Sequence, residues 1–446
     1  MLTNRPIIGP IEVNELHSSG KGIAYWNDKA YYIPFAIPNE QYLLQTENRR
    51  LGFRTARIIK IEKASEFRVK PSCPYYFECG GCNFMHIEYE QQLNLKKLLL
   101  QNALNKYKVN YLVSEIMASP APLHYRNKAS YQIRIRQGKL LIGFHPEWNK
   151  NEIVEIDSCY LLKPVINKYF NKLKYILNEF NNHKPLENFL SLTIRANDYD
   201  QIMILLELLK KPNEFEIDVL KAIKKIISKG DSIYYYIKSN NKYSWPEYYL
   251  MDDTEPYLYE EINQVKLRIS PFTFFQNNKA ITELIVNEIK RLIPFDSVLL
   301  MYDLYSGNGT LSLPLVYDRS IKLIGIEGNP MAIEDAKVNS QHNPLHLYIV
   351  GDVLATFNDK LIKKYDKPSL ILLDPPRSGT LIEIQKNIIA SGTTYIVYVS
   401  CNHVSLAWNL SQLISDYNII FLKIFDMFPQ THQMETLVVL KKSKFL

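Results

Sequence analysis

The chain of 446 residues lacks most of the features that mark secreted and membrane proteins. It has only five cysteines, too few and too unevenly spaced for a secreted disulfide framework. No apolar run reaches the roughly 18 residues that cross a bilayer, and Met1–Pro10 has no signal-peptide pattern. Internal repeats and low-complexity tracts are also missing. We therefore expect a cytoplasmic protein without a membrane span.

A strong excess of one charge is missing as well, because 53 lysines and arginines accompany 46 aspartates and glutamates, a net charge of +7. Such a balance matters for function only where charge is clustered. One cluster lies between Leu44 and Lys70, with eight basic residues and three acidic ones. The basic residues are Arg49, Arg50, Arg54, Arg57, Lys60, Lys63, Arg68 and Lys70. A solvated surface is the simpler interpretation, and contact with nucleic acid is the functional one.

The composition, with 46% hydrophobic residues, is that of a globular protein of roughly two to four domains. We expect three: residues 1–65, 66–265 and 266–446. The first contains short β-type segments between turn residues, which favours a small OB-like β-barrel of the kind that binds nucleic acid. These segments are Ile7–Leu16, Gly22–Trp26, Ala30–Pro34 and Arg54–Glu62.

Residues 66–265 mix helices and strands, which predicts an α+β domain. An apolar stripe of helical period predicts a helix over Glu90–Tyr107. Two β-type runs, Ser191–Ala196 and Gln201–Glu207, predict a hairpin, and Glu214–Ser228 has the pattern of an amphipathic helix.

From about Phe272 onward, apolar strands alternate with helices, a pattern typical of a doubly wound parallel sheet with ligands at the carboxyl ends of its strands. The predicted helices are Asn278–Leu292, Met331–Gln341 and Leu381–Ser391. The predicted strands are Ser297–Leu304, Leu323–Glu327, His346–Val350, Ser369–Leu373, Thr394–Ser400, Ile419–Phe425 and Glu435–Lys441.

A glycine-rich loop follows the first of these strands and begins at Asp303. Its D-x-x-x-G-x-G pattern, which contains Gly307, allows a tight turn in which the backbone can approach a ligand. Glu327 ends the next strand, where a carboxylate can accept hydrogen bonds from ribose hydroxyls, and Asp352 follows the strand after that. The combination predicts a nucleoside-type cofactor site, whereas an ordinary strand–turn–helix connection is the simpler interpretation.

Three further side chains lie at predicted strand ends. Asp374 precedes two prolines that would hold it rigidly over the cofactor pocket. Cys401 follows the next strand and is a candidate nucleophile, although a lone cysteine is more often inert packing. Glu435 opens an otherwise apolar final strand and is a candidate general base, or else a surface glutamate.

The other four cysteines are Cys73, Cys79 and Cys82, in a C-x5-C-x2-C pattern, and Cys159 further along the chain. Four thiolates can hold an iron–sulfur cluster or a tetrahedral zinc ion. Gly80 would let the backbone wrap closely around such a group.

These motifs together resemble the RNA uracil-5-methyltransferase family. The resemblance covers essentially the whole chain. It is carried by Tyr125–Lys128, Ile142–His145, Phe274–Asn278, Asp303–Tyr305, Asp374–Arg377, Ser400–Asn402 and His432–Leu437, which occur in the order of the family's motifs. It implies a Rossmann-like class I methyltransferase domain that uses S-adenosyl-L-methionine, preceded by a TRAM barrel.

The resemblance also implies the residue roles. Cys401 would add to C6 of uracil and Glu435 would remove the C5 proton. Gln276, Tyr305, Glu327 and Asp374 match the family's cofactor-binding positions, with Asp352, Asp303 and Gly307 beside them. Two departures are Ser306, in place of a non-catalytic cysteine, and His403, in place of a proline whose loss leaves the loop after Cys401 less rigid.

The cysteine spacing resembles the [4Fe-4S] site of the 23S rRNA enzymes of this family, with Cys159 as the distant fourth ligand. We expect a monomer acting on a single-stranded loop of 23S rRNA, because the target base must leave its stack. The alternatives are a tRNA uracil-5-methyltransferase, an exocyclic-amino methyltransferase and a non-catalytic RNA-binding iron–sulfur protein, and zinc remains the alternative metal.

Overall fold

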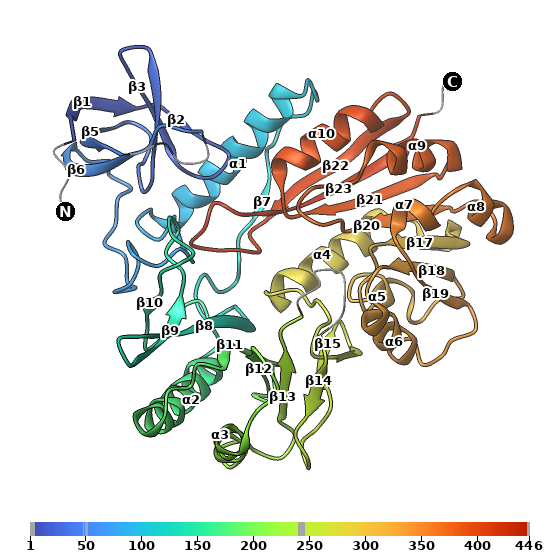
Figure 1. Ribbon diagram of the computed structural model, residues 1–446. Coiled ribbons are helices and arrows are strands. Elements are labelled where there is room, and N and C mark those ends of the chain that lie inside the picture. Colours follow the sequence, from blue (N-terminus) through green and yellow to red (C-terminus); the bar gives the residue numbers. More distant parts are fainter. Residues whose placement is uncertain (1–4, 48, 50–51, 240–245, 444–446) are drawn as a thin grey trace.

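The computed structural model describes residues 5–47, 49, 52–239 and 246–443. Figure 1 shows an N-terminal β-rich part in blue, a middle part in green and a C-terminal α/β part in yellow to red. No helix in the described ranges is long and apolar enough to cross a membrane. The mixed α/β fold predicted from the sequence is confirmed.

The N-terminal part consists of two three-stranded antiparallel sheets around a small apolar core that contains Val13, Ile33 and Tyr42. The predicted strand Ile7–Leu16 is divided, because its first seven residues form β1, which pairs with β5, and its last two residues pair with β3. Strand β5, which is not among the predicted strands, buries Tyr42 and Leu44 and leaves Leu43 between them partly exposed. The strands are β1 (Ile7–Val13), β2 (Glu15–Leu16), β3 (Gly22–Trp26), β4 (Lys29–Ile33), β5 (Glu40–Thr46) and β6 (Ala56–Lys63).

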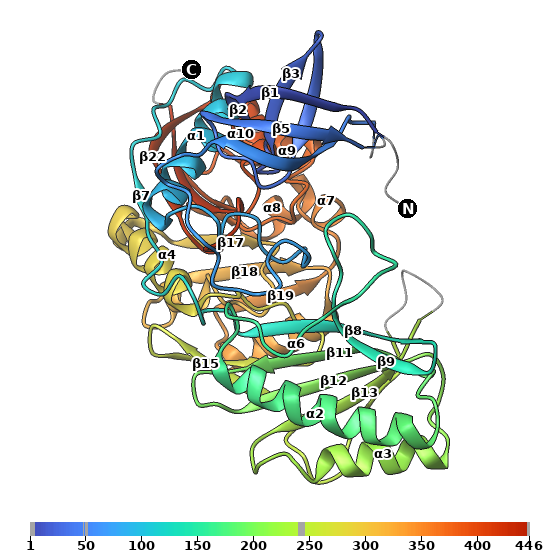
Figure 2. The ribbon, with the colours of Figure 1, turned by 90° about the vertical axis from the view of Figure 1, so that its left-hand side faces the viewer.

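The middle part is a seven-stranded sheet in the order β10-β9-β8-β11-β12-β13-β14, and two helices cover one of its faces (Figure 2). The predicted hairpin is confirmed as β11 and β12. The predicted helix Glu214–Ser228 ends earlier, at Lys224. The strands are β8 (Lys128–Arg136), β9 (Lys139–Phe144), β10 (Val154–Glu155), β11 (Phe189–Ala196), β12 (Ile202–Leu208), β13 (Ser232–Ile237) and β14 (Tyr248–Leu250), and the helices are α2 (Pro164–His183) and α3 (Glu214–Lys224).

The C-terminal part is an eight-stranded sheet in the order β19-β18-β17-β20-β21-β23-β22-β7. Its first five strands are parallel, as predicted, but β23 is antiparallel to both β21 and β22. The strands are β17 (Leu300–Leu304), β18 (Lys322–Glu327), β19 (His346–Val350), β20 (Leu370–Leu373), β21 (Tyr395–Ser400), β22 (Tyr417–Phe425), β23 (Glu435–Lys442) and β7 (Ile116–Met117). A separate hairpin, β15 (Leu258–Ile262) and β16 (Val265–Ile269), precedes this sheet.

Helices cover both faces of the C-terminal sheet. Residues of α4, α5 and α6 bury one face, and residues of α1, α7, α9 and α10 bury the other. Helix α1 belongs by sequence to the middle part, yet it packs against α10. The helices are α1 (Tyr89–Lys106), α4 (Lys279–Leu292), the short 3-10 helix η1 (Phe295–Ser297), α5 (Leu313–Val316), α6 (Pro330–Asn339), α7 (Val353–Thr356), α8 (Asp359–Tyr365), α9 (Ile382–Ser391) and α10 (His403–Leu413).

Candidate active site

The glycine-rich loop makes a tight turn at the carboxyl end of β17. Tyr305, Gly307 and Gly309 have positive φ angles of 69°, 53° and 83°. Gly307 is the conformationally free residue that such a turn needs, and a Cβ placed there would meet no atom within 4 Å. The backbone at Gly307 is therefore open to a ligand.

Glu327 ties this loop to the end of the neighbouring strand β18. One of its carboxylate oxygens accepts a hydrogen bond from the Gly307 amide at 3.1 Å, and the other accepts one from the Asn329 amide at 2.8 Å. These two bonds fix the orientation of the carboxylate at the rim of the sheet. Asp352, beyond the next strand, caps α7 by accepting from the Ala355 amide at 3.1 Å.

A narrow cleft brings several of the predicted cofactor residues together. It is lined by Phe274, Gln276, Asp303, Tyr305, Ser306, Gly307, Asn308, Thr310, Leu311 and Asp374. Glu327 and Asp352 do not line it, although Glu327 contacts it through Gly307. A cleft with carboxylates, an amide and an aromatic ring can bind both polar and apolar groups of one small molecule.

The two aspartates of the cleft are unusual carboxyl groups. Burial raises the pKa of Asp303 to about 7, helped by the charge of Glu327. Burial and the charge of Asp303 raise the pKa of Asp374 to about 7, although a hydrogen bond of 2.9 Å from the Gln276 side chain opposes the rise. Perturbed carboxyl groups in a cleft are typical of functional sites.

Cys401 lies at the carboxyl end of β21 and is half-buried. Burial raises the pKa of its thiol to about 12, and the charges of Glu435 and Asp374 act in the same direction. The positive charge of Arg377 opposes them. The thiol is therefore protonated at neutral pH in the absence of ligand, and its surroundings must change before it can act as a nucleophile.

Glu435 lies beside this thiol because β23 inserts next to β21, where Ser400 is paired with Thr436. Only 2% of Glu435 is exposed, and its Oε1 has no hydrogen-bond partner among the described residues. Burial raises its pKa well above the usual range, and the charge of Asp374 adds to this effect. The raised pKa favours the protonated form, and in its ionised form a buried carboxylate with a free oxygen can accept a proton from a bound ligand.

The segment after Cys401 is held by Asn402. Its side chain caps α10, accepts a hydrogen bond from the Val404 amide at 3.0 Å and donates one to the Arg377 carbonyl at 2.8 Å. His403 occupies the first position of α10 and is buried, and its Nε2 has no partner within the described ranges. Burial lowers the pKa of His403 to about 4, so it is neutral at physiological pH. The cap therefore fixes the loop where the family's usual proline is missing.

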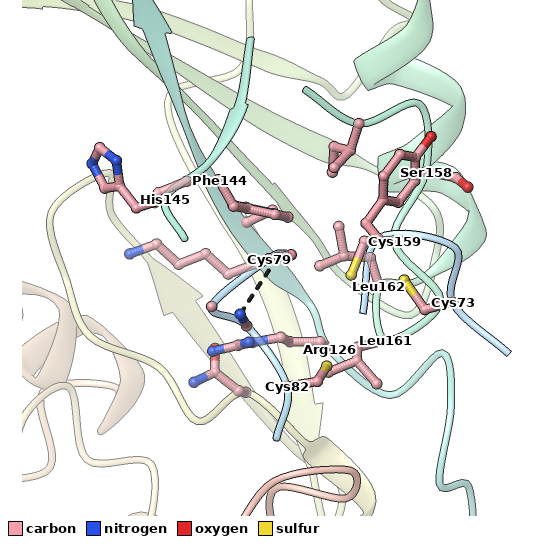
Figure 3. A pocket seen from close by; sticks show the side chains of 18 of the residues that line it. Cys73, Cys79, Cys82, Arg126, Phe144, His145, Ser158, Cys159, Leu161 and Leu162 are labelled. Carbon is pink, nitrogen blue, oxygen red and sulfur yellow. Dashed lines mark hydrogen bonds between the residues drawn. The ribbon is translucent and has the colours of Figure 1, made fainter. Parts of the chain in front are cut away.

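The four remaining cysteines line one cavity of about 470 Å³ (Figure 3). All four are free thiols, and burial raises the pKa of each, that of Cys79 to about 11. The Gly81 amide donates to the Sγ atom of Cys79 at 3.4 Å. Across the described residues, no three histidine, cysteine or acidic side chains are grouped closely enough to hold a metal ion. The four cysteines thus lie around one cavity, as the sequence pattern predicted. Metal binding stays a prediction.

Three cations on the wall of this cavity were not predicted as functional residues: Arg126, Lys128 and Arg195. Burial lowers the pKa of Arg195 to about 10 and that of Lys128 to about 8. The Nε atom of Arg126 has no hydrogen-bond partner in the described part of the chain. The signal in the sequence was that Arg195 is the one charged residue of β11, because a buried charge requires polar partners, and here its guanidinium donates to the Thr273 carbonyl at 2.8 Å.

The basic cluster of the N-terminal part is only partly available for a ligand. Arg57, Lys60 and Lys63 are exposed on β6. Arg68 instead forms an ion pair with the buried Glu40 at 2.7 Å, so it contributes to the structure of this part. Arg50 lies outside the described residues.

Comparison with known proteins adds independent findings. A family model described as tRNA (uracil-5-)-methyltransferase matches residues 354–443. A protein of Enterococcus faecalis named as an uncharacterised RNA methyltransferase is 30% identical, with 97% of each chain covered. A Thermotoga maritima protein with the same name is 29% identical, covering 97% of this chain and 98% of its own.

One solved structure is similar along nearly the whole chain. It is the tRNA (uracil-54, C5)-methyltransferase of Pyrococcus abyssi in complex with S-adenosyl-L-homocysteine. The TM-score is 0.76 at 25% identity, with 96% of this chain and 98% of that chain covered.

Proposed function

Since the chain belongs to the RNA uracil-5-methyltransferase family, we propose that it transfers a methyl group from S-adenosyl-L-methionine to C5 of a uridine in 23S rRNA through a covalent Cys401 adduct. The observation that carries this proposal is the convergence of Cys401, Glu435 and Asp374 at one edge of the sheet, where Asp374 and Cys401 follow the carboxyl ends of β20 and β21 and Glu435 begins the antiparallel β23. A thiol and a proton-accepting carboxyl group are what methylation of a ring carbon needs and methylation of an amine does not.

The residues around the glycine-rich loop suit the chemistry of the methyl donor. The open backbone at Gly307 allows close approach, and the fixed carboxylate of Glu327 can accept bonds from ribose hydroxyls. Asp374, held by Gln276, lines this cleft and also acts through its charge on the thiol. The donor supplies an electrophilic sulfonium methyl group, and these residues bind and orient it.

The residues of this chain then act in sequence. The Cys401 thiolate adds to C6, and the electron pair of the C5–C6 double bond becomes available at C5 to form the bond to the methyl group, whose bond to the donor's sulfur breaks and leaves its electron pair on that sulfur. Glu435 accepts the C5 proton, the C5–C6 double bond re-forms and the thiolate leaves with the electrons of the S–C6 bond. Arg377 favours the thiolate through its charge.

We propose that Cys73, Cys79, Cys82 and Cys159 hold a [4Fe-4S] cluster. Four soft thiol donors on one cavity fit such a group, and the cations Arg126, Lys128 and Arg195 would balance its negative charge. The thiols would have to close on the metal, because the described residues do not group them tightly. Zinc is the alternative, and metal analysis separates the two.

The choice of 23S rRNA rests on the resemblance of this cysteine pattern, whereas the Pyrococcus abyssi structure favours a tRNA substrate as the second candidate. The residues proposed as a TRAM barrel, 1–65, present Arg57, Lys60 and Lys63 to RNA. A monomeric state, a cytoplasmic location and the domain boundaries at residues 65 and 265 remain predictions.

The experiment is to map 5-methyluridine in 23S rRNA and tRNA from cells with and without the gene, and to repeat the reaction on the unmodified RNAs with purified protein. A 5-methyluridine that is lost from 23S rRNA and restored there by the protein supports the proposal. Restoration in tRNA alone would select the second candidate. Methylation of an exocyclic amine would overturn the uracil chemistry.

A further inference from the structure

A buried ion pair joins helix α1 to the segment that leads to Glu435. The Nζ atom of Lys96 lies 2.5 Å from Oδ1 of Asp426, and both side chains are completely buried. Lys96 also donates to the Phe428 carbonyl at 3.1 Å. Desolvation makes such a pair a poor source of stability, and a well-packed apolar pair would often serve as well or better. Stability alone therefore does not explain the Lys96–Asp426 ion pair.

More hydrogen bonds fix the same segment from the same helix. Tyr89 donates to Oδ2 of Asp426 at 2.8 Å. The Gln92 side chain donates to the Gln430 side chain at 3.0 Å and accepts from the Gln430 amide at 3.0 Å. Polar side chains of α1 thus hold residues 426–430 at both ends, at Asp426 and at Gln430.

This segment leads into the strand that begins at Glu435. Glu435 is the register partner of Phe425, the last residue of β22, and Asp426 follows Phe425 directly. Residues 426–434 form the connection between the two strands, so a shift of Asp426 moves one end of this connection and Glu435 lies at the other. Burial lowers the pKa of Lys96, while the charge of Asp426 opposes this effect.

We propose that Lys96 and Asp426 form a positioning pair that aligns Glu435 for removal of the C5 proton. This inference rests on the proposed function of Glu435. The pair touches neither the cofactor cleft nor Cys401, because neither residue lines the cleft or interacts with the thiol. Its loss should slow the elimination step and leave adduct formation and methyl transfer nearly intact.

The test compares the Lys96→Met/Asp426→Asn double variant with Lys97→Met, which changes a half-buried lysine on the same helix. Both charges are removed together in the double variant, so no uncompensated buried charge remains to unfold the protein. Tyr89→Phe provides a milder change, since it keeps the ion pair and removes the hydroxyl that donates to Asp426 and accepts from the Ser119 amide. Circular dichroism and S-adenosyl-L-homocysteine affinity report whether each variant is folded.

Rapid-quench assays with methyl-labelled donor would measure methyl transfer and release of RNA from the covalent adduct separately. We expect release to slow by about tenfold or more in the double variant, by less in Tyr89→Phe, and not at all in Lys97→Met, because small misplacements of a catalytic group cost large factors in rate. Methyl transfer should change by less than about threefold.

Equal loss of methyl transfer and release, or release as fast as in Lys97→Met, would overturn the positioning role. If the double variant does not fold, Tyr89→Phe decides, and normal release there overturns the proposal. A wild-type protein that forms no covalent methylated adduct would instead refute the proposed function itself.

Discussion

The side-chain amide of Gln276 donates a hydrogen bond of 2.9 Å to the carboxylate of Asp374, 98 residues further along the chain. The bond joins the segment before α4 to the carboxyl end of β20. It also favours the charged form of Asp374 against the effect of burial. The cofactor cleft and the thiol therefore share one oriented carboxyl group.

The first prediction concerns this bond. Gln276→Leu removes a donor to a carboxylate and should raise the pKa of Asp374 further, because only the charged form benefits from the bond. Both residues line the cleft, so the variant leaves the carboxyl group of Asp374 unoriented there, and one charge-assisted hydrogen bond to the ligand lost in this way, about 1.5–3 kcal/mol, would lower the affinity for S-adenosyl-L-homocysteine by about tenfold or more. Titration calorimetry measures this affinity. Gln412→Leu, outside the cleft, is the control, and equal affinity in the two variants would contradict the prediction.

The second prediction concerns the nucleophile. Cys401→Ala should abolish turnover and leave donor affinity nearly unchanged, because the thiol acts on uracil. RNA with 5-fluorouridine at the target should trap wild-type protein in a covalent adduct, since fluorine at C5 cannot leave as a proton. Substantial methylation by the variant would remove the covalent mechanism.

The third prediction is a pH dependence. Burial raises the pKa of the Cys401 thiol to about 12, so the reactive thiolate is scarce at pH 7 and becomes more abundant as the pH rises. Alkylation of Cys401 by iodoacetamide, followed by peptide mass spectrometry, should accelerate steadily between pH 7 and about 10. Arg377→Ala should slow it at each pH, because the charge of Arg377 lowers this pKa. A rate that levels off below pH 8 would contradict the expected protonation state.

Much of the site was predictable because the end of each apolar run in the sequence marks the end of a strand. Asp303, Glu327, Asp374 and Cys401 lie in or just after apolar runs, and parallel strands bring their carboxyl ends to one edge of a sheet. The place of Glu435 was not predictable in this way. It depends on the insertion of β23 between β21 and β22, which is a matter of strand pairing and not of local pattern.

Other features depend on contacts far apart in sequence. Lys96 and Asp426, which form an ion pair, are 330 residues apart in the sequence. Each is a charged residue that the sequence alone would place on the surface. Strand β5 does alternate buried and less buried side chains. One of its buried positions is the charged Glu40, which pairs with Arg68, so the alternation of apolar and polar residues is not visible in the sequence. Local periodicity therefore predicts the elements better than the contacts between them.

The fourth prediction concerns the cysteine cavity. Cys79→Ser replaces a soft thiol by a hydroxyl, a poor ligand for iron, and should cause loss of the metal and lower solubility. Binding of S-adenosyl-L-homocysteine should persist, because Cys79 does not line the cofactor cleft. Wild-type protein purified without oxygen should contain iron and acid-labile sulfide at about four each per chain. A colourless wild-type protein with one zinc would decide for the other metal.

The most direct test of the covalent mechanism uses Glu435→Gln. This variant keeps the shape of the side chain but cannot accept the C5 proton, so the thiolate cannot leave after methyl transfer. The variant is first incubated with RNA and S-adenosyl-L-methionine. The measurement is then mass spectrometry of the denatured sample. The expected product is a methylated uridine linked to the peptide that contains Cys401. Free 5-methyluridine at the wild-type rate, or no link to Cys401 in a variant that binds RNA and donor normally, would contradict it.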